Sequence, residues 1–395
     1  MSQLSRARRW WRSVATPGFA DRGGVAVLVA VLLAGGVLLG MAALSVDVGQ
    51  LKAEREQLIS AADGAAQKVA ITCGKSPSSC GTSTNFAAVQ TSAQTIADAN
   101  GNDGLNDVTL ICGSGGALAP CDPTKEPTNL TACLNSMPTD GIKFVEVHTA
   151  TRTSKTSTLL PTAFAASFVP GYNGATLGAC SRVAWGTPGG GLSLTFSQCE
   201  WQESVLEADG TLDYADPANP QPSDERVITI HKSNSPTCVL STSGQDAPGG
   251  FGWLDSDPAS AGTGPCFTSV DVGGTVTSDT GNNVAKDCQD EVEALQQSRT
   301  VVGLPIYSQV TGNGNGGKNG VTYTISGIAS FVITGYFFSN GNGNGGSANS
   351  WLTGKQPCNT GDTCISGYFV NGIVDSTSIQ AGDNLFGATA VKTIG

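Results

Sequence analysis

The side chains best suited to chemistry in this sequence are twelve cysteines and two histidines, His148 and His231. No Cys-x-x-Cys pair occurs, and the first cysteine is Cys73. Because zinc sites are built from closely spaced thiolate and imidazole ligands, this spacing does not favour a metal centre. An even number of cysteines, all after an apolar N-terminal segment, is typical of disulfides formed outside the cytosol. The sequence therefore predicts disulfide bonds and no metal site.

Closeness along the chain is the only guide to how the cysteines pair, because spacing alone does not determine connectivity. Six cysteines form three short-range candidate pairs. These pairs are Cys73–Cys80, Cys180–Cys199 and Cys358–Cys364.

Neither histidine lies in a catalytic motif. His148 follows Val145 and Val147 in a run typical of a β-strand, where a structural histidine is the simpler interpretation. The Gly-x-Ser-x-Gly turn of hydrolases is absent. Two glycine-rich tracts, 311–320 and 339–350, do not link a strand to a helix as a nucleotide-binding loop must. We therefore expect no catalytic residue and no cofactor.

The composition argues against a cytosolic enzyme. Charged residues make up 13% of the chain, against about 25% in ordinary soluble proteins. Glycine accounts for 52 of 395 residues, and the net charge is −11 although residues 1–22 carry five arginines. So acidic a chain does not suit nucleic acid, whose phosphates require a basic face. These features favour an extracellular, turn-rich, mainly β protein.

A charge-free apolar stretch of 24 residues, 23–46, follows this basic segment. About 20 apolar residues match the roughly 30 Å hydrocarbon core of a bilayer, and the preceding arginines place the N-terminus in the cytoplasm. We therefore predict a single-pass cell-membrane protein with residues from Asp47 onward outside. A cleaved signal peptide ending near Ser45 is the alternative, although the apolar run exceeds the roughly 7–15 residues of such a signal.

Gly36 and Gly40 form a Gly-x-x-x-Gly step within the apolar stretch. Such a step allows two membrane helices to approach closely, so self-association is one interpretation. Chance is the other, because this segment is rich in glycine.

The apolar helix should continue outside the membrane, since Leu51, Leu58 and Ala62 recur at helical spacing. Further along, two strands are expected at 321–327 and 330–338. The overall expectation is an α+β protein with five segments: basic cytoplasmic segment 1–22, transmembrane helix 23–46, juxtamembrane helix 47–72, Cys-rich loop region 73–140, and a mainly β, disulfide-stapled extracytoplasmic domain 141–395 with flexible Asn/Gly loops at 311–320 and 339–350.

Three motifs occur together within about residues 21–72. An Arg-Gly pair precedes the apolar span, Ala-Leu-x-Val-Asp-x-Gly closes it, and the following helix contains Ala-Ala-Asp-x-Ala-Ala. The matching positions are Arg22, Gly23, Asp47, Gly49, Ala61, Ala62, Asp63, Ala65 and Ala66. Over about residues 21–72 this combination resembles the N-terminal domain of TadE/TadG-like proteins of Flp (Tad) pilus assembly. The remainder resembles the outer region of actinobacterial TadG-like proteins more loosely.

The resemblance implies a non-catalytic envelope protein that supports assembly or anchoring of a pilus, with the membrane and other Tad pilus or secretion proteins as partners. Some TadG-like proteins bind metal at an Asp-x-Ser-x-Ser loop, which residues 375–378 do not match, so no metal is carried over. Asp47 would lie at the outer membrane boundary, where it ends the span or pairs with a partner. Asp63 would be an exposed helix residue or a partner contact. A surface adhesin and a secreted hydrolase are the alternatives.

Overall fold

The fold is given by a computed structural model. The residues it describes are 20–34, 36–80, 86–116, 118–122, 133, 138, 141–154, 157–229, 251–254, 266–277, 286–311, 322–339, 346–376, 378–382 and 385–395. Within these residues the chain is an α+β protein with two large β-sheets and five disulfides.

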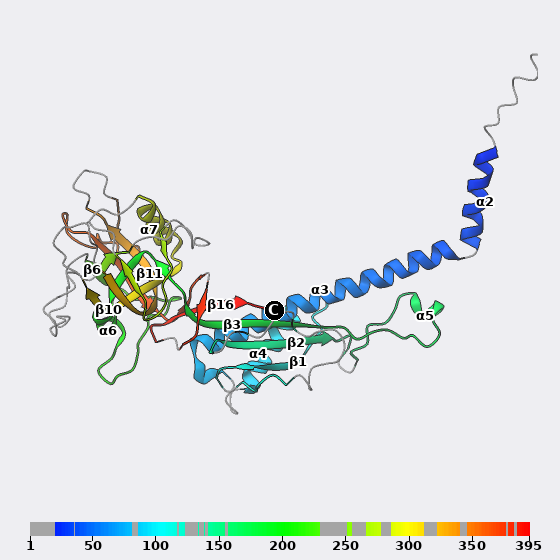
Figure 1. Ribbon diagram of the computed structural model, residues 1–395, viewed down its shortest axis with the longest axis horizontal. Coiled ribbons are helices and arrows are strands. Elements are labelled where there is room, and N and C mark those ends of the chain that lie inside the picture. The colour runs from blue at the N-terminus through cyan, green and yellow to red at the C-terminus, as the bar shows by residue number, and fades with distance from the viewer. Residues whose placement is uncertain are drawn as a thin grey trace, which may run out of the picture.

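Two helices come first in the described chain; the first of them and the N-terminal half of the second form a stalk that extends away from both sheets (Figure 1). Helix α2 covers Ala20–Ala34 and α3 covers Val37–Lys75. They meet at Gly36, whose φ of 70° is a left-handed conformation that glycine adopts readily. Because the chain turns there, the prediction of one uninterrupted helix over 23–46 is wrong. Among the described residues, no helix combines the length and the apolar composition needed to cross a bilayer.

Helix α3 contains all of the expected juxtamembrane helix and ends two residues before a proline. Its last residue is Lys75, and Pro77 begins a short 3-10 helix, η1, at Pro77–Ser79. The disulfide Cys73–Cys80 closes this turn, with 4.5 Å between the two Cα atoms. The end of the helix is therefore fixed both by proline and by a covalent bond.

The first body consists of α3, α4 and a six-stranded sheet. Helix α4 covers Phe86–Asn100. The strand order is β1-β2-β3-β16-β14, with β15 paired to β3. The strands are β1 Asn106–Ser114, β2 Lys143–Thr151, β3 Gly178–Pro188, β14 Gly372–Ile373, β15 Ile379–Gln380 and β16 Ala388–Thr393. The β1–β2, β2–β3 and β3–β16 pairs are antiparallel.

Small side chains allow α3 and α4 to pack closely on one face of this sheet. Ala61 and Ala65 of α3 are fully buried and share a core with Val145 of β2. Gly64 lies against α4, where a Cβ atom would stand 2.8 Å from the Asn100 amide nitrogen. The alanines of the Ala-Ala-Asp-x-Ala-Ala motif therefore form a packing face.

The second body is inserted between β3 and β16, which are neighbours in the first sheet. Its eight-stranded sheet has the order β6-β13-β11-β10-β5-β7, and both β9 and β12 pair with β11. The elements are β4 Gly191–Leu192, β5 Leu194–Ser197, α6 Gln198–Val205, β6 Arg226–Thr229, β7 Phe251–Trp253, β8 Phe267–Thr268, β9 Thr275–Thr277, α7 Lys286–Ser298, β10 Val301–Thr311, β11 Thr322–Phe337, β12 Ser347–Ala348 and β13 Cys364–Val370. Its core contains Phe196, Phe331 and Phe369 in edge-to-face contact.

The expected division at residue 140 does not separate these bodies. Strand β1 lies in the segment predicted to be Cys-rich loop, yet it pairs with β2 along its whole length. The sheet is completed by β3 and by β16 from the end of the chain. Of the expected Asn/Gly loops, residues 312–320 and 340–345 lie outside the described residues.

Candidate functional site

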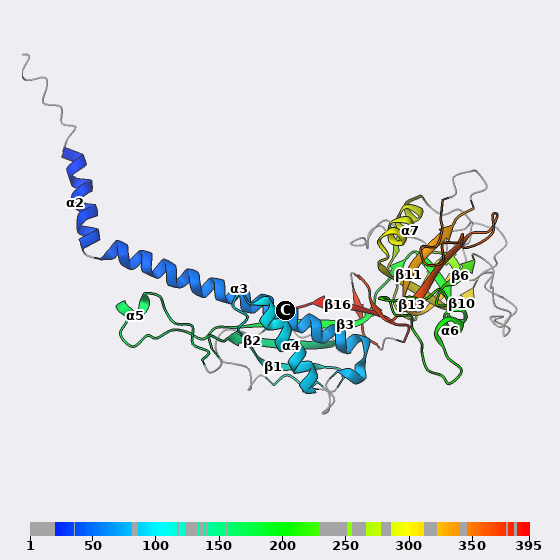
Figure 2. The same cartoon turned by 180° about the vertical axis from the view of Figure 1, so that it is seen from behind.

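Asp47 connects the stalk to a loop far along the chain. It lies on α3 and is only 6% exposed. The connection between β2 and β3 contains the short helix α5, Ala165–Phe168. Figures 1 and 2 both show α5 beside the N-terminal half of α3, away from the two sheets. The Asp47 side chain lies at the contact between them.

Three backbone N–H groups at the start of α5 donate to the Asp47 carboxylate. Its Oδ1 accepts from Ala163 at 2.8 Å and from Phe164 at 3.1 Å, and its Oδ2 accepts from Ala165 at 2.5 Å. The first N–H groups of a helix have no acceptor within the helix itself. The carboxylate satisfies them from another element, and they in turn compensate for its removal from water.

The observed partner of Asp47 differs in kind from the two roles expected for it. The sequence led us to expect the end of a membrane span or a contact with another protein. In the structure the Asp47 carboxylate instead accepts hydrogen bonds from a loop of its own chain. Backbone N–H donors have no sequence motif, so no pattern in the sequence identifies this segment as the partner of Asp47.

The other family-motif positions are not brought together with Asp47. Asp63 is half-buried on α3, sixteen residues further along, which corresponds to about 24 Å of helix. Gly49 is exposed, with open space where a Cβ would lie. Arg22 and Gly23 form part of α2. The family-motif positions are therefore spread along α2 and α3 and do not form one pocket.

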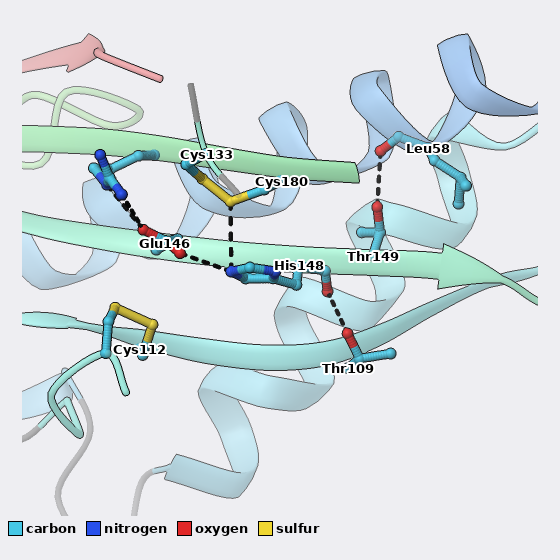
Figure 3. The surroundings of a disulfide bond; sticks show 10 residues. Leu58, Thr109, Cys112, Cys133, Glu146, His148, Thr149 and Cys180 are labelled. Atoms are coloured by element: carbon cyan, nitrogen blue, oxygen red, sulfur yellow. Dashed lines mark hydrogen bonds and ion pairs between the residues drawn. A yellow bond between two sulfur atoms is a disulfide. The ribbon is translucent and has the colours of Figure 1, made fainter. Parts of the chain in front are cut away.

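A second buried charged group lies on the opposite face of the first sheet from α3 and α4 (Figure 3). Glu146 of β2 bonds through Oε1 to His148 Nε2 at 2.7 Å and through Oε2 to Arg182 Nη2 at 2.6 Å. The Nε atom of Arg182 also donates to Oε2, at 2.9 Å. Glu146 and Arg182 are direct cross-strand neighbours, so the register of β2 and β3 builds this pair.

The environment of Glu146 favours its charged form. Burial alone would raise the pKa of its carboxyl, but hydrogen bonds from His148 and Arg182, together with their positive charge, lower that pKa below its ordinary value of 4.5. The carboxylate is therefore ionised at neutral pH, with the guanidinium beside it.

Two disulfides flank this group, and one of them touches His148. The Cys180 Sγ lies 3.5 Å from His148 Nε2, and Cys180 is bonded to Cys133. Possible ligand atoms of Cys133, Glu146, His148 and Cys180 lie within 4.8 Å of one another. Metal-binding cysteine is a thiolate, which a disulfide sulfur is not. The cluster therefore fits a covalently stapled core better than a metal centre.

His148 is poorly placed for catalysis. Its residue is fully buried, whereas a general base must come within hydrogen-bond reach of its substrate. Within the described residues its Nδ1 atom has no hydrogen-bond partner. The other histidine, His231, lies outside the described residues.

The disulfides confirm two of the three candidate pairs. Cys73–Cys80 and Cys358–Cys364 are both bonded. The pair Cys180–Cys199 is wrong, because Cys180 bonds Cys133. Strand β3 carries the chain about 26 Å beyond Cys180 at about 3.3 Å per residue, and Cys199 lies in α6 of the other body. The remaining described bridges, which the sequence did not single out, are Cys112–Cys121 and Cys266–Cys288.

Comparison with protein-family models, with curated proteins and with solved structures finds no match for this chain. The resemblance to TadE/TadG-like proteins therefore rests on the sequence alone, chiefly on the motifs of residues 21–72.

A cavity of about 480 Å³ lies where the two bodies meet. Its walls come from α7, β10 and the segment around β14, and Val391 of β16 closes one side. Apolar residues such as Leu295 and Val302 line it, with the carboxylates of Glu291 and Asp375 among them. Its volume falls within the roughly 300–1,000 Å³ range of small-molecule sites.

Proposed function

We propose that this protein is a non-catalytic envelope protein, anchored in the cell membrane by its stalk, that supports the assembly or anchoring of a Flp (Tad) pilus. The observation that carries the proposal is the apolar surface of the stalk. This surface covers α2 and the first turns of α3, the helix that carries most of the family motif. The anchor and the pilus role are argued separately below.

The stalk exposes large apolar side chains between Val25 and Val48. Six of them are between 61% and 66% exposed: Val25, Val27, Leu28, Val31, Met41 and Leu44. Soluble proteins rarely expose a continuous apolar surface of this kind. Residues 23–46 would extend about 35 Å as helix at 1.5 Å per residue, close to the roughly 30 Å hydrocarbon core. In this proposal α2 and the first turns of α3 are embedded together, on either side of Gly36.

The cysteines support an extracytoplasmic position for both bodies. All five described disulfides follow residue 72. Disulfides of this kind persist in oxidising compartments and are rare in the cytosol. Together with the arginines that precede the apolar stretch, they favour an N-terminus in the cytoplasm and both bodies outside.

The pilus role is tested by deleting the gene in the bacterium that carries it and counting surface filaments by electron microscopy. We expect filaments to be lost, and to return with the wild-type gene but not with a variant in which Leu28 and Leu33 are both replaced by arginine. Pilin abundance in the cell should not change. A deletion strain with normal filaments would reject the pilus role.

A surface adhesin or binding module is the second candidate, and the cavity between the bodies favours it. Filling that cavity with Val302→Trp should then abolish attachment of cells to a surface while leaving filament number unchanged. If attachment follows filament number in every strain, the cavity has no such role. A secreted hydrolase with a Ser/His/Asp triad would instead require His148 or His231, and the burial of His148 does not support it.

A further inference from the structure

The loop that Asp47 holds is uncharged and carries several apolar side chains. We call residues 157–177, which join β2 to β3 and contain α5, the α5 loop. The sequence from Thr156 to Ser181 contains no charged residue in 26 positions, although exposed loops are normally polar. Its core reads LLPTAFAASFVPGY, a run with two phenylalanines and a tyrosine. An uncharged run with these aromatic side chains is typical of a surface that contacts an apolar partner.

The tip of the α5 loop exposes the apolar side chains it carries. Leu159, Phe164, Val169 and Tyr172 are exposed, with Phe164 at 46% and Val169 at 53%. They belong to one loop whose two arms are joined by paired hydrogen bonds between Leu160 and Ala175. The apolar groups are therefore held together at the end of a structured ribbon.

The position of this tip is fixed by the stalk. Asp47 is the first charged residue after the apolar stretch, and its carboxylate binds the N–H groups of Ala163, Phe164 and Ala165. Ala43, one turn earlier on α3, is also buried, whereas Leu44 and Val48 of the same helix are exposed. The tip therefore lies at the level where the apolar surface of the stalk ends.

We infer that the tip of the α5 loop inserts into the outer leaflet of the membrane beside the anchor helix, with lipid as its partner. This inference rests on the proposed anchor, because that anchor brings Asp47 to the boundary of the hydrocarbon core. Aromatic side chains are enriched at that level. The absence of charge over 26 residues removes the main cost of entering it.

The geometry also explains why a carboxylate is tolerated at this level. An aspartate at the edge of the hydrocarbon core needs partners that remain when water is withdrawn. The three N–H donors of the loop supply them. Stalk and α5 loop then form one apolar foot, and the sheets of both bodies stand above the bilayer.

The test is photocrosslinking of the full-length chain, reconstituted in vesicles of phosphatidylethanolamine and phosphatidylglycerol. Benzoylphenylalanine replaces one residue at a time: Phe164 in the loop, Leu33 in the stalk, and Leu212 in the second body, which is similarly exposed at 43%. Lipid adducts are counted by mass spectrometry. We expect the yields at Phe164 and Leu33 to exceed the yield at Leu212 at least fivefold.

The three positions separate failure of this inference from failure of the anchor. Lipid adducts at Leu33 with none at Phe164 would overturn the lipid contact of the loop and leave the anchor intact. Absence of adducts at both positions would overturn the anchor as well. A crosslink from Phe164 to a second copy of the chain would overturn the inference in favour of self-association.

Discussion

At the scale of single residues, Asp47 has the most specific role in the structure. Replacing it in Asp47→Asn leaves an amide whose NH₂ group cannot accept from the loop N–H donors. Hydrogen bonds to charged groups contribute about 1.5–3 kcal/mol, so local opening of the loop should become about 10- to 100-fold more frequent. Hydrogen exchange of the Ala163, Phe164 and Ala165 amides, followed by mass spectrometry, measures this directly.

The matched control is Asp63→Asn on the same helix, about 24 Å away along α3. It removes the same charge from the same element without touching the loop, so exchange at residues 163–165 should stay at the wild-type rate. Equal acceleration in both variants would show that helix charge, and not the Asp47 carboxylate, determines loop opening.

Glu146 gives the first body a dependence on acid. Its pKa in the folded chain lies below the ordinary value of 4.5, so the carboxylate stabilises the fold above about pH 4.5 and this contribution is lost as pH falls toward the lowered pKa. Glu146→Gln removes the carboxylate that faces Arg182, at a cost of about 3–5 kcal/mol at pH 7. Free energies of opening, from hydrogen exchange of the β2 and β3 amides, should show this.

The pH series provides the sharper comparison. The stability gap between the wild type and Glu146→Gln should narrow between pH 5 and pH 3, because only the wild type has the Glu146 carboxylate, whose stabilising charge is lost as pH falls. Glu207→Gln, which changes an exposed carboxylate of the second body, should show no gap in β2 and β3 at either pH. A gap for Glu146→Gln that stays constant with pH would exclude the assigned ion pair as its cause.

At the scale of elements, Gly36 decides the shape of the stalk. An alanine strongly disfavours the φ of 70° seen there, and alanine is about 1 kcal/mol more favourable than glycine inside a helix. Gly36→Ala should therefore join α2 and α3 into one helix. In detergent micelles, the ¹³Cα chemical shifts of residues 33–38 should move to helical values. Gly24→Ala, within α2 and with free space for a Cβ, should leave them unchanged.

Several elements could be predicted because their signals are local. The helical spacing of Leu51 and Leu58 predicts the long helix, and Pro77 explains why it ends at Lys75. Gly36 was not recognised as a break, because glycine is common in apolar helices. The sequence predicts separate strands at 321–327 and 330–338, yet β11 runs through residues 328 and 329 without interruption. Gly327 lies within this single strand. Its missing side chain leaves space for the Phe386 ring, a contact that no local pattern reveals.

The candidate sites also divide into those that local sequence predicts and those that depend on strand pairing or tertiary contact. Cys73–Cys80 was predictable because one helix end brings both cysteines together. Cys133–Cys180 was not, because β2 and β3 must pair before those cysteines meet. Sequence marked Asp47 as special but could not identify its partner, since the donors are backbone atoms 116–118 residues away.

At the scale of the whole molecule, one strand pair determines the organisation. Strands β3 and β16 lie side by side although the entire second body separates them in the chain. Thr389 of β16 also donates to the Gly74 carbonyl at the end of α3, at 3.2 Å. The end of the chain thus completes the body that the stalk begins, and the second body leaves and returns at neighbouring points of one sheet.

This arrangement predicts that damage to β16 is confined to the first body. Ala390 is 1% exposed and pairs with Gly186 of β3, so Ala390→Asp buries a charge without a partner, at a cost of at least about 3 kcal/mol. Exchange at the β3 amides should accelerate at least 100-fold, while β11 and β13 of the second body keep their protection. Thr393→Asp, an exposed position on the same strand, should change neither. Loss of protection in both bodies after Ala390→Asp would show instead that they unfold as one cooperative unit. The second body would then depend on the pairing of β3 with β16, which holds its two ends together.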